Sequence, residues 1–512
     1  MSLSRIARTL CPRPLRGHLD RIESSPLGAR LARGAFWSLT GAFVSRAMTL
    51  ASSILVARIL GRETFGELGI IQSTVGMFGT IAGFGLGLTA NKHVAEFRVK
   101  DPARAGRIVA LAALFAMLTG GLTSAALAML APWLAQRTLA APQLAGLLRI
   151  GALYLLVSAV NGAQAGALAG FEAFRAIATR SLWAGIATLP LMVGGAYLAG
   201  LHGAVWGMIG GMALNCLLNQ LALRREARVA HVILSYRGCL AECPLLWRFS
   251  LPAFLAGVMV GPVVWGGQTL LVNRPNGYSE MGLFTAVNVV SNVLLLVGQV
   301  LGAPLLPVMS HERDSGNEHL GRVNMLSTWA LGAIPAVLLL SAPELIQAAY
   351  GKQFSGAAFR HAFALAILFT AIQSYKQGMY RVLTARSMMW WAFTSNLQWA
   401  ATFLLAAYFL VRFGAVGLVL AYLIGYAVNT VIFVPLYMSL QLIPRKTIVS
   451  LEAGLIWLVL VAMTAMILLD WPLPVRLLAL PVGSFLIVLA FWRMMAERPA
   501  KPPTLPEGAD GV

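Results

Sequence analysis

The chain has 512 residues, of which 58% are hydrophobic and only 11% are charged, and its formal net charge is +20. Soluble globular proteins carry about a quarter of their residues as charged side chains, so this composition excludes a soluble enzyme. The positive charge does not indicate nucleic-acid binding, because most of the Lys and Arg residues lie between long apolar stretches.

Residues 1–33 are rich in Arg and lack a long apolar core, which predicts a basic cytoplasmic tail and not a cleavable signal peptide. Fourteen apolar stretches of about 20 residues follow, and each is long enough to cross ~30 Å of hydrocarbon as a helix. Strand-like alternation is missing from them, so we predict an all-α polytopic membrane protein. The predicted spans are 35–57, 66–90, 108–131, 147–169, 181–200, 203–223, 249–272, 282–309, 323–342, 361–383, 390–411, 415–440, 449–469 and 475–492.

The charged residues predict the orientation of these spans. Lys and Arg concentrate in the segments on the N-terminal side of the alternation, which is the positive-inside pattern and places both termini in the cytoplasm. The basic loops are expected to lie against anionic membrane lipids. The loops are too short to fold into a soluble catalytic domain, and the Pro-rich tail at 494–512 is predicted to be disordered.

An internal repeat organises the spans. Three short motifs recur in the same order about 210 residues apart. They are Phe65–Gly69 and Tyr278–Gly282, Gly106-Arg107 and Gly321-Arg322, and Gly203–Val205 and Gly414–Val416. Because the repeat unit is six spans, an even number, both copies enter the membrane in the same direction. The prediction is two six-helix lobes around a central cavity, 34–223 and 249–440, with a cytoplasmic linker at 224–248 and two additional helices in 441–493.

Small residues and prolines predict local features of the helices. Glycines recur at helix-packing spacing in spans four and six, at Gly162, Gly166 and Gly170 and at Gly203, Gly207 and Gly211. Such faces allow two helices to approach closely. Pro252 and Pro262 predict a bend in span seven.

Arg46 is predicted to lie about 18 Å into span one, where a charged side chain is costly unless it faces water or a partner. Thr49 and Ser53 share its face, and no acidic residue lies in the middle of a span to neutralise it. We therefore expect Arg46 to face an aqueous cavity and to bind an anionic substrate. The alternative is that it snorkels or bonds to helix-end carbonyls.

Span ten carries a polar stripe on an otherwise apolar helix: Thr370, Gln373, Lys376, Gln377 and Tyr380. Such a stripe is not expected to face lipid, although Lys376 lies near enough to the cytoplasmic end to snorkel. Spans four and eight carry similar polar faces. The first includes Tyr154, Ser158, Asn161 and Gln164, and the second includes Asn288, Ser291, Asn292 and Gln299. Some of these amides are expected only to bond neighbouring helices.

These residues predict a cavity lined by cations and amides without a resident carboxylate. Arg binds phosphate oxygens in a forked geometry, and Asn, Gln and Tyr suit sugar hydroxyls, so the expected ligand is anionic and rich in hydroxyls. No paired carboxylates, nucleotide loop or metal-ligand spacing is found, and Glu344 and Asp470 are expected to be isolated on the outer face. We expect no enzymatic activity, no cofactor and no metal.

Three segments resemble a known family. One is Leu68–Thr89, which is rich in Gly and Thr. The turn Ala57-Arg-Ile-Leu-Gly-Arg-Glu-Thr-Phe-Gly66 and the segment Gly166-Ala-Leu-Ala-Gly-Phe-Glu-Ala-Phe-Arg175 are similar to the bacterial polysaccharide transporter family, which includes the O-antigen flippases of the multidrug/oligosaccharidyl-lipid/polysaccharide exporter superfamily. The resemblance implies two six-helix bundles around a cavity. It also implies translocation of an undecaprenyl-pyrophosphate-linked oligosaccharide (an O-antigen, capsule or exopolysaccharide unit) across the bacterial inner membrane. An acidic residue is frequent in span seven of relatives, but Gln268 stands here, so ion coupling through that helix is not expected.

The expected substrate-binding residues are therefore Arg46, Asn161, Gln164, Asn288, Asn292, Gln373, Lys376, Gln377 and Tyr380. Three alternatives stay open: a multidrug or cation antiporter of the same fold, which would favour acidic cavity residues; a membrane glycan polymerase or ligase, which would need a long exterior loop; and a non-transporting scaffold. Pairing with a glycan polymerase also stays open.

Overall fold

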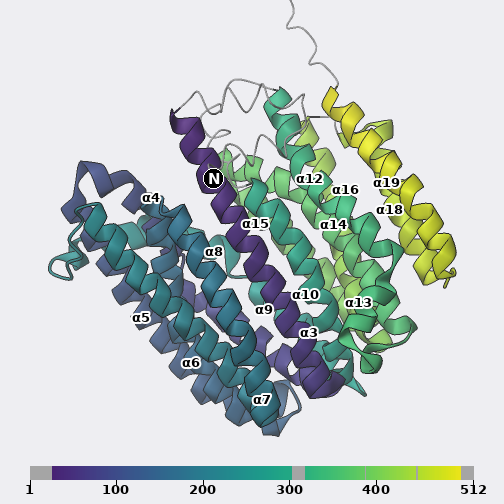
Figure 1. Cartoon of the computed structure of the whole chain (residues 1–512), viewed down its shortest axis with the longest axis horizontal. Coiled ribbons are helices and arrows are strands. Elements are labelled where there is room, and N and C mark those ends of the chain that lie inside the picture. The colour runs from purple at the N-terminus through teal and green to yellow at the C-terminus, as the bar shows by residue number, and fades with distance from the viewer. Residues whose placement is uncertain (1–25, 303–317, 387, 445–447, 497–512) are drawn as a thin grey trace, which may run out of the picture. The chain divides into compact units, whose positions relative to one another are not determined.

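The computed structural model describes residues 26–302, 318–386, 388–444 and 448–496, which contain helices and turns and no strand (Figure 1). Ten helices in this part of the chain are long and apolar enough to cross a membrane. Three of them, of 58, 56 and 50 residues, are each long enough for two crossings. The all-α polytopic architecture is confirmed, and the count of fourteen spans stays a prediction.

The chain forms two compact units, Met1–Gly282 and Leu283–Val512. The lobe boundaries expected from the repeat, 34–223 and 249–440, stay predictions. The expected N-terminal tail lies outside the described residues except for its last eight, which begin the first described helix, and residues 497–512 also lie outside them.

Unit 1 contains the following elements: α3 (Pro26–Gly83), α4 (Leu86–Lys100), α5 (Pro102–Trp133), α6 (Ala145–Gly170), α7 (Phe174–Val229), a short 3-10 helix at Cys239–Glu242, a π-helical turn at Leu246–Ser250, α8 (Leu251–Gly257), α9 (Val260–Val272) and the first turn of α10 (Gly277–Gly302). In α3 the helix turns at Gly61, whose φ of 79° is readily adopted only by glycine. In α7 the turn lies at Ala199 and Gly200. Each of these long runs is therefore a helical hairpin.

Unit 2 contains the rest of α10, followed by α12 (Glu318–Ser341), α13 (Pro343–Tyr350), α14 (Ala357–Ala385), α15 (Met389–Leu410), α16 (Gly414–Ser439), α18 (Leu451–Leu468) and α19 (Leu473–Ala496). Helix α14 is the central element, since it contacts α12, α16 and α18, and most of its residues are buried.

Close packing at glycines brings the helices of unit 1 together. A Cβ at Gly166 would collide with the backbone of Gly87, and one at Gly207 would collide with Leu191. Gly170, Gly203 and Gly211 are equally crowded, whereas the Cβ position of Gly162 is open. The predicted packing faces are confirmed at five of the six glycines.

Proline explains an interruption in span seven. Helix α8 ends at Gly257 and α9 begins at Val260. Pro262 has no N–H to donate to the carbonyl of Val258, so the ladder is broken there. Val258 and Met259 between the two helices keep right-handed helical backbone angles, so the predicted bend stays a prediction.

The segment between α7 and α8 packs onto unit 1. Glu242 is buried, and its carboxylate accepts hydrogen bonds from Arg104 Nε at 3.0 and 3.1 Å and from Arg107 Nη2 at 3.4 Å. A Cβ at Gly106 would collide with the carbonyl of Ile233. The predicted linker therefore has defined contacts with the start of α5.

The internal repeat is visible in the backbone. Gly106 of the first Gly-Arg motif packs on Ile233, after the sixth predicted span, and Gly321 of the second lies beside Pro444, after the twelfth. The hairpin turns before those spans also match: Gly200 has φ 56° and ψ −134°, and Gly414 has φ 67° and ψ −144°. The backbone is therefore similar in the corresponding regions of the two predicted copies, although Gly200 lies three residues before the glycine that the sequence motif pairs with Gly414.

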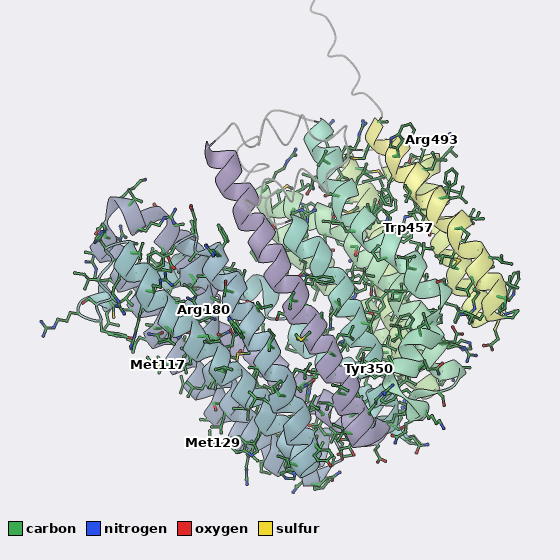
Figure 2. The ribbon with its side chains drawn as sticks, in the orientation of Figure 1. Met117, Met129, Arg180, Tyr350, Trp457 and Arg493 are labelled. Atoms are coloured by element: carbon green, nitrogen blue, oxygen red, sulfur yellow. The ribbon has the colours of Figure 1, made fainter. Side chains whose placement is uncertain are left out.

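An aromatic cluster attaches the two additional helices to unit 2. Trp329 of α12 stacks with Trp457 of α18, which is labelled in Figure 2, at a centroid distance of 5.6 Å. Trp329 also meets Phe491 of α19 edge-on at 5.3 Å. Tyr375 of α14 contacts both tryptophans. Because aromatic pairs favour these geometries, the cluster fixes α18 and α19 against the core of the unit.

Candidate functional site

A cavity of about 500 Å³ lies within unit 2, and the polar stripe of α14 forms one wall of it. Gln373, Lys376, Gln377 and Tyr380 all line it. The fifth residue of the stripe, Thr370, is fully buried and bonds to the Ala366 carbonyl of its own helix at 2.6 Å, so it does not reach the cavity. The lining is completed by Leu295, Gln299, Met379, Arg381, Leu383, Ala392, Ser395, Asn396, Tyr426 and Tyr437.

Lys376 is half-buried, and its ammonium is held by an uncharged partner. Its Nζ donates a hydrogen bond to Asn429 Oδ1 and lies 5.8 Å from the centroid of the Tyr426 ring. The amide of Asn429 is oriented by the Ser395 carbonyl at 2.8 Å and by Gln398 Oε1 at 2.6 Å, both of which accept from its Nδ2. Because these two bonds hold the NH₂ group of Asn429 in place, its Oδ1 atom faces Lys376.

Arg381 is a second cation at this cavity, and it is 9% exposed. Its Nε donates to Asn324 Oδ1 at 2.7 Å, and its Nη2 donates to the Asn324 carbonyl at 2.9 Å and to Thr328 Oγ1 at 3.1 Å. Helix α12 comes this close because Gly378 packs directly on the Asn324 backbone. All three acceptors are neutral.

The sequence prediction missed Arg381 because it lies at the end of span ten, where a snorkelling cation is ordinary. A signal was present, since Arg381 follows Gln377 at i+4 and so continues the polar stripe by one turn.

The two glutamines of the stripe present oxygen acceptors. Gln373 Nε2 donates to the Tyr426 hydroxyl at 2.5 Å, and Gln377 Nε2 donates to the Leu295 carbonyl at 3.3 Å. The Oε1 atoms of both are buried and accept no hydrogen bond within the described part of the chain. The wall therefore offers positive charge together with acceptors for hydroxyl groups.

Charge around the cavity is of one sign. None of the described residues lining it is acidic, and neither Lys376 nor Arg381 forms an ion pair with any described residue. Withdrawing a cation from water without a counter-charge is costly, so this arrangement favours an anionic ligand.

Other predicted site residues lie elsewhere. Asn161 accepts a hydrogen bond from Asn219 at 2.8 Å, and Gln164 donates to Gln220 at 2.8 Å, so both link α6 to the second half of α7 within unit 1. These contacts match the expectation that some amides only bond neighbouring helices. Arg46 is exposed on α3 in unit 1.

The polar residues of span eight divide in a similar way. Asn288 is half-buried and Asn292 is exposed, and neither lines the cavity, whereas Gln299 on the same helix does.

Unit 1 contains a further cation, Arg180, which the sequence prediction placed outside the spans. Arg180 lies within α7, and its Nη1 is buried without a hydrogen-bond partner among the described residues (Figure 2).

Glu344 and Asp470 were expected to be isolated, and this is wrong. Glu344 pairs with Arg476 and with Arg360 (Nε to Oε1, 3.8 Å), and Asp470 pairs with Arg360 at 2.6 Å. Glu344 and Arg360 precede Asp470 and Arg476 by at least 110 residues, and only the packing of α13, α14 and α19 brings the two pairs together. No group of three or more His, Cys, Asp or Glu residues suited to a metal ion occurs among the residues that the structure describes.

Comparison with family models decides the family. The model for "polysaccharide biosynthesis protein" matches residues 31–312, more than half of the chain. The chain belongs to this family. Its membership agrees with the likeness seen at the turn Ala57–Gly66. A search of curated proteins found no match.

Solved structures similar to this polysaccharide biosynthesis family member are membrane transporters. The lipid II flippase MurJ in an inward closed conformation is 14% identical with a TM-score of 0.66, covering 88% of this chain and 98% of the flippase. An inward-facing multidrug resistance MATE transporter is 15% identical with a TM-score of 0.59, covering 80% of this chain and 98% of the transporter. A transporter of the MOP superfamily from Pyrococcus furiosus is 15% identical with a TM-score of 0.55, covering 81% of this chain and 95% of that transporter.

At these identities the likeness shows the fold. The family member has the helical fold of MOP-superfamily transporters and is a multi-pass membrane protein.

Proposed function

We propose that this protein is a flippase that carries a lipid-linked oligosaccharide across the membrane by alternating access. The expected substrate is an undecaprenyl-pyrophosphate-linked unit of O-antigen, capsule or exopolysaccharide, and the expected location is the bacterial inner membrane with both termini in the cytoplasm. The family membership and the fold shared with a lipid II flippase support this proposal.

The observation that carries the proposal is the pair of uncompensated cations at the unit 2 cavity. Lys376 and Arg381 are held by neutral oxygens, so no described side chain supplies a counter-charge to either of them. A diphosphate offers at least two negative charges and several acceptor oxygens, and it would replace the missing counter-charge. Diphosphate binding in this cavity would therefore be favoured by the positive charge that no described side chain of unit 2 neutralises.

The rest of the cavity suits the sugar next to the diphosphate. Gln373 Oε1 and Gln377 Oε1 are ready to accept from hydroxyl groups, and the side chains of Asn396, Tyr426 and Tyr437 add amide and phenol groups. In this proposal the polyprenyl chain stays in lipid, and Arg46 in unit 1 is a second contact for phosphate during the cycle.

The cavity also weighs against the alternatives. A cation or drug antiporter favours acidic groups at its binding site, and the described lining of this cavity contains none. A polymerase or ligase would need a large exterior loop with catalytic groups, and the described connections between the helices are short.

Export of surface glycan tests the proposal. Lys376→Gln and Arg381→Gln are compared with the wild type at matched protein levels, and Arg386→Gln is the control because Arg386 is exposed at the end of the same helix. We expect the two cavity variants to lose export and to accumulate lipid-linked units facing the cytoplasm, while the control exports normally. Full export in both cavity variants would refute the assigned role.

A further inference from the structure

A second pocket, of about 280 Å³, lies in unit 2 where α18 passes into α19. Helices α18 and α19 have 18 and 24 residues and are apolar enough to cross a membrane, so the turn between them lies at the boundary between hydrocarbon and water. Trp471 and Leu473 line the pocket and are exposed, as is usual for side chains at this depth.

Four charged side chains form the wall of this pocket: Glu344 of α13, Arg360 of α14, Asp470 of the turn and Arg476 of α19. Asp470 follows α18 in the left-handed region at φ 51°, where its own N–H bonds back to the Ile467 carbonyl at 3.1 Å. This turn directs the chain so that Asp470 meets Arg360 at 2.6 Å. Two positive and two negative groups share one pocket, and their charges cancel.

The four charged side chains do not fill all of one another's hydrogen-bonding positions. Arg476 is 4% exposed and donates from Nη2 to Glu344 and from Nε to the Trp471 carbonyl at 3.1 Å, but its Nη1 has no hydrogen-bond partner among the residues that the structure describes. Glu344 Oε2 is also buried without a partner within the described chain. One buried donor and one buried acceptor are thus left over, and leaving such groups unpaired is costly.

We propose that this pocket binds the headgroup of a zwitterionic phospholipid with a primary ammonium, that is, phosphatidylethanolamine. Its phosphate accepts from Arg476 and Arg360, and its ammonium donates to Glu344 and to the half-exposed carboxylate of Asp470. The hydroxyls of an anionic phosphatidylglycerol headgroup can donate to the carboxylates but bring no positive charge to pair with them, and a choline headgroup has no N–H to donate. The exposed Trp471 and Leu473 lie where the glycerol and the start of the acyl chains would pass.

Native mass spectrometry of the delipidated full-length protein tests this proposal. Dioleoyl phosphatidylethanolamine, phosphatidylcholine and phosphatidylglycerol are titrated separately at equal concentrations. We expect phosphatidylethanolamine to bind about tenfold more tightly than the other two, because phosphatidylcholine lacks the N–H donors and phosphatidylglycerol lacks the positive charge, and one hydrogen bond between an ammonium and a carboxylate contributes roughly that factor.

Variants locate the binding. Arg360→Gln and Asp470→Asn alter side chains that are partly exposed, and each is expected to remove the preference for phosphatidylethanolamine. Arg412→Gln is the matched control, since Arg412 is an exposed residue of unit 2 that does not line the pocket. Equal binding of the three lipids by the unaltered protein would overturn the proposal without any variant. A preference that survives both pocket variants would also overturn it and would leave the cluster as an ion-pair network that holds α18 and α19 in place. Neither result depends on what the protein transports.

Discussion

Replacing Lys376 with glutamine is expected to weaken binding of a polyprenyl diphosphate by about 30- to 700-fold. The substitution removes the charge but leaves a donor for Asn429, so the local packing is preserved. A unit charge about 4 Å from a phosphate oxygen contributes about 4 kcal/mol at an effective dielectric constant of 20, and about half of that where the open cavity admits water. Since ~1.4 kcal/mol corresponds to a factor of ten, a loss of about 2 to 4 kcal/mol gives this range.

The assay compares two lipids on the purified, reconstituted protein. Undecaprenyl diphosphate carries the charge that Lys376 is proposed to bind, and undecaprenol has the same chain without it. Lys376→Gln should lower affinity for the diphosphate only, Lys376→Arg should restore most of it, and Arg386→Gln should change neither. An unchanged Kd for the diphosphate in Lys376→Gln, or an equal loss for both lipids, would refute the electrostatic reasoning.

Three further predictions concern the packing of the molecule. Gly66→Val would drive a side chain into the backbone of α10 and should destabilise the protein by about 1–3 kcal/mol or more, seen as a lower apparent Tm, whereas Gly76→Val in the same helix has open space and should be nearly neutral. Glu242→Gln should release the segment between α7 and α8 from the arginines of α5, so limited trypsin digestion there should be faster; an unchanged rate would contradict the role of this ion pair. The hydrogen bond from Arg360 lowers the pKa of Asp470, so its contribution to stability is complete above the ordinary carboxyl range and is lost as the pH falls through the lowered pKa. The apparent Tm of the wild type should therefore fall more steeply between about pH 5 and 2 than that of Asp470→Asn. Parallel curves of apparent Tm against pH for the two proteins would contradict this contribution of Asp470.

The sequence alone determined the fold class and much of the local structure. Long apolar stretches permit only helices in a bilayer, so the polytopic architecture follows from composition and length. Glycine at Gly166 and Gly207 predicted close helix contacts because no other residue leaves room for a neighbouring backbone. The stripe from Gln373 to Tyr380 was predictable because helical periodicity fixes which residues share a face.

Tertiary structure decided which polar residues share a site. Asn161 and Gln164 resemble Gln373 and Gln377 in sequence, but the first two bond to amides on the neighbouring helix, whereas the Oε1 atoms of the second two have no hydrogen-bond partner in the described part of the chain. Arg381 became a candidate only because α12 supplies neutral oxygens from a distant part of the chain. The ion pairs of Glu344 likewise depend on arginines that other helices supply. Periodicity is a property of one helix, whereas the partner of a buried polar group depends on which other helix packs against it, and that is set by contacts summed over the whole lobe.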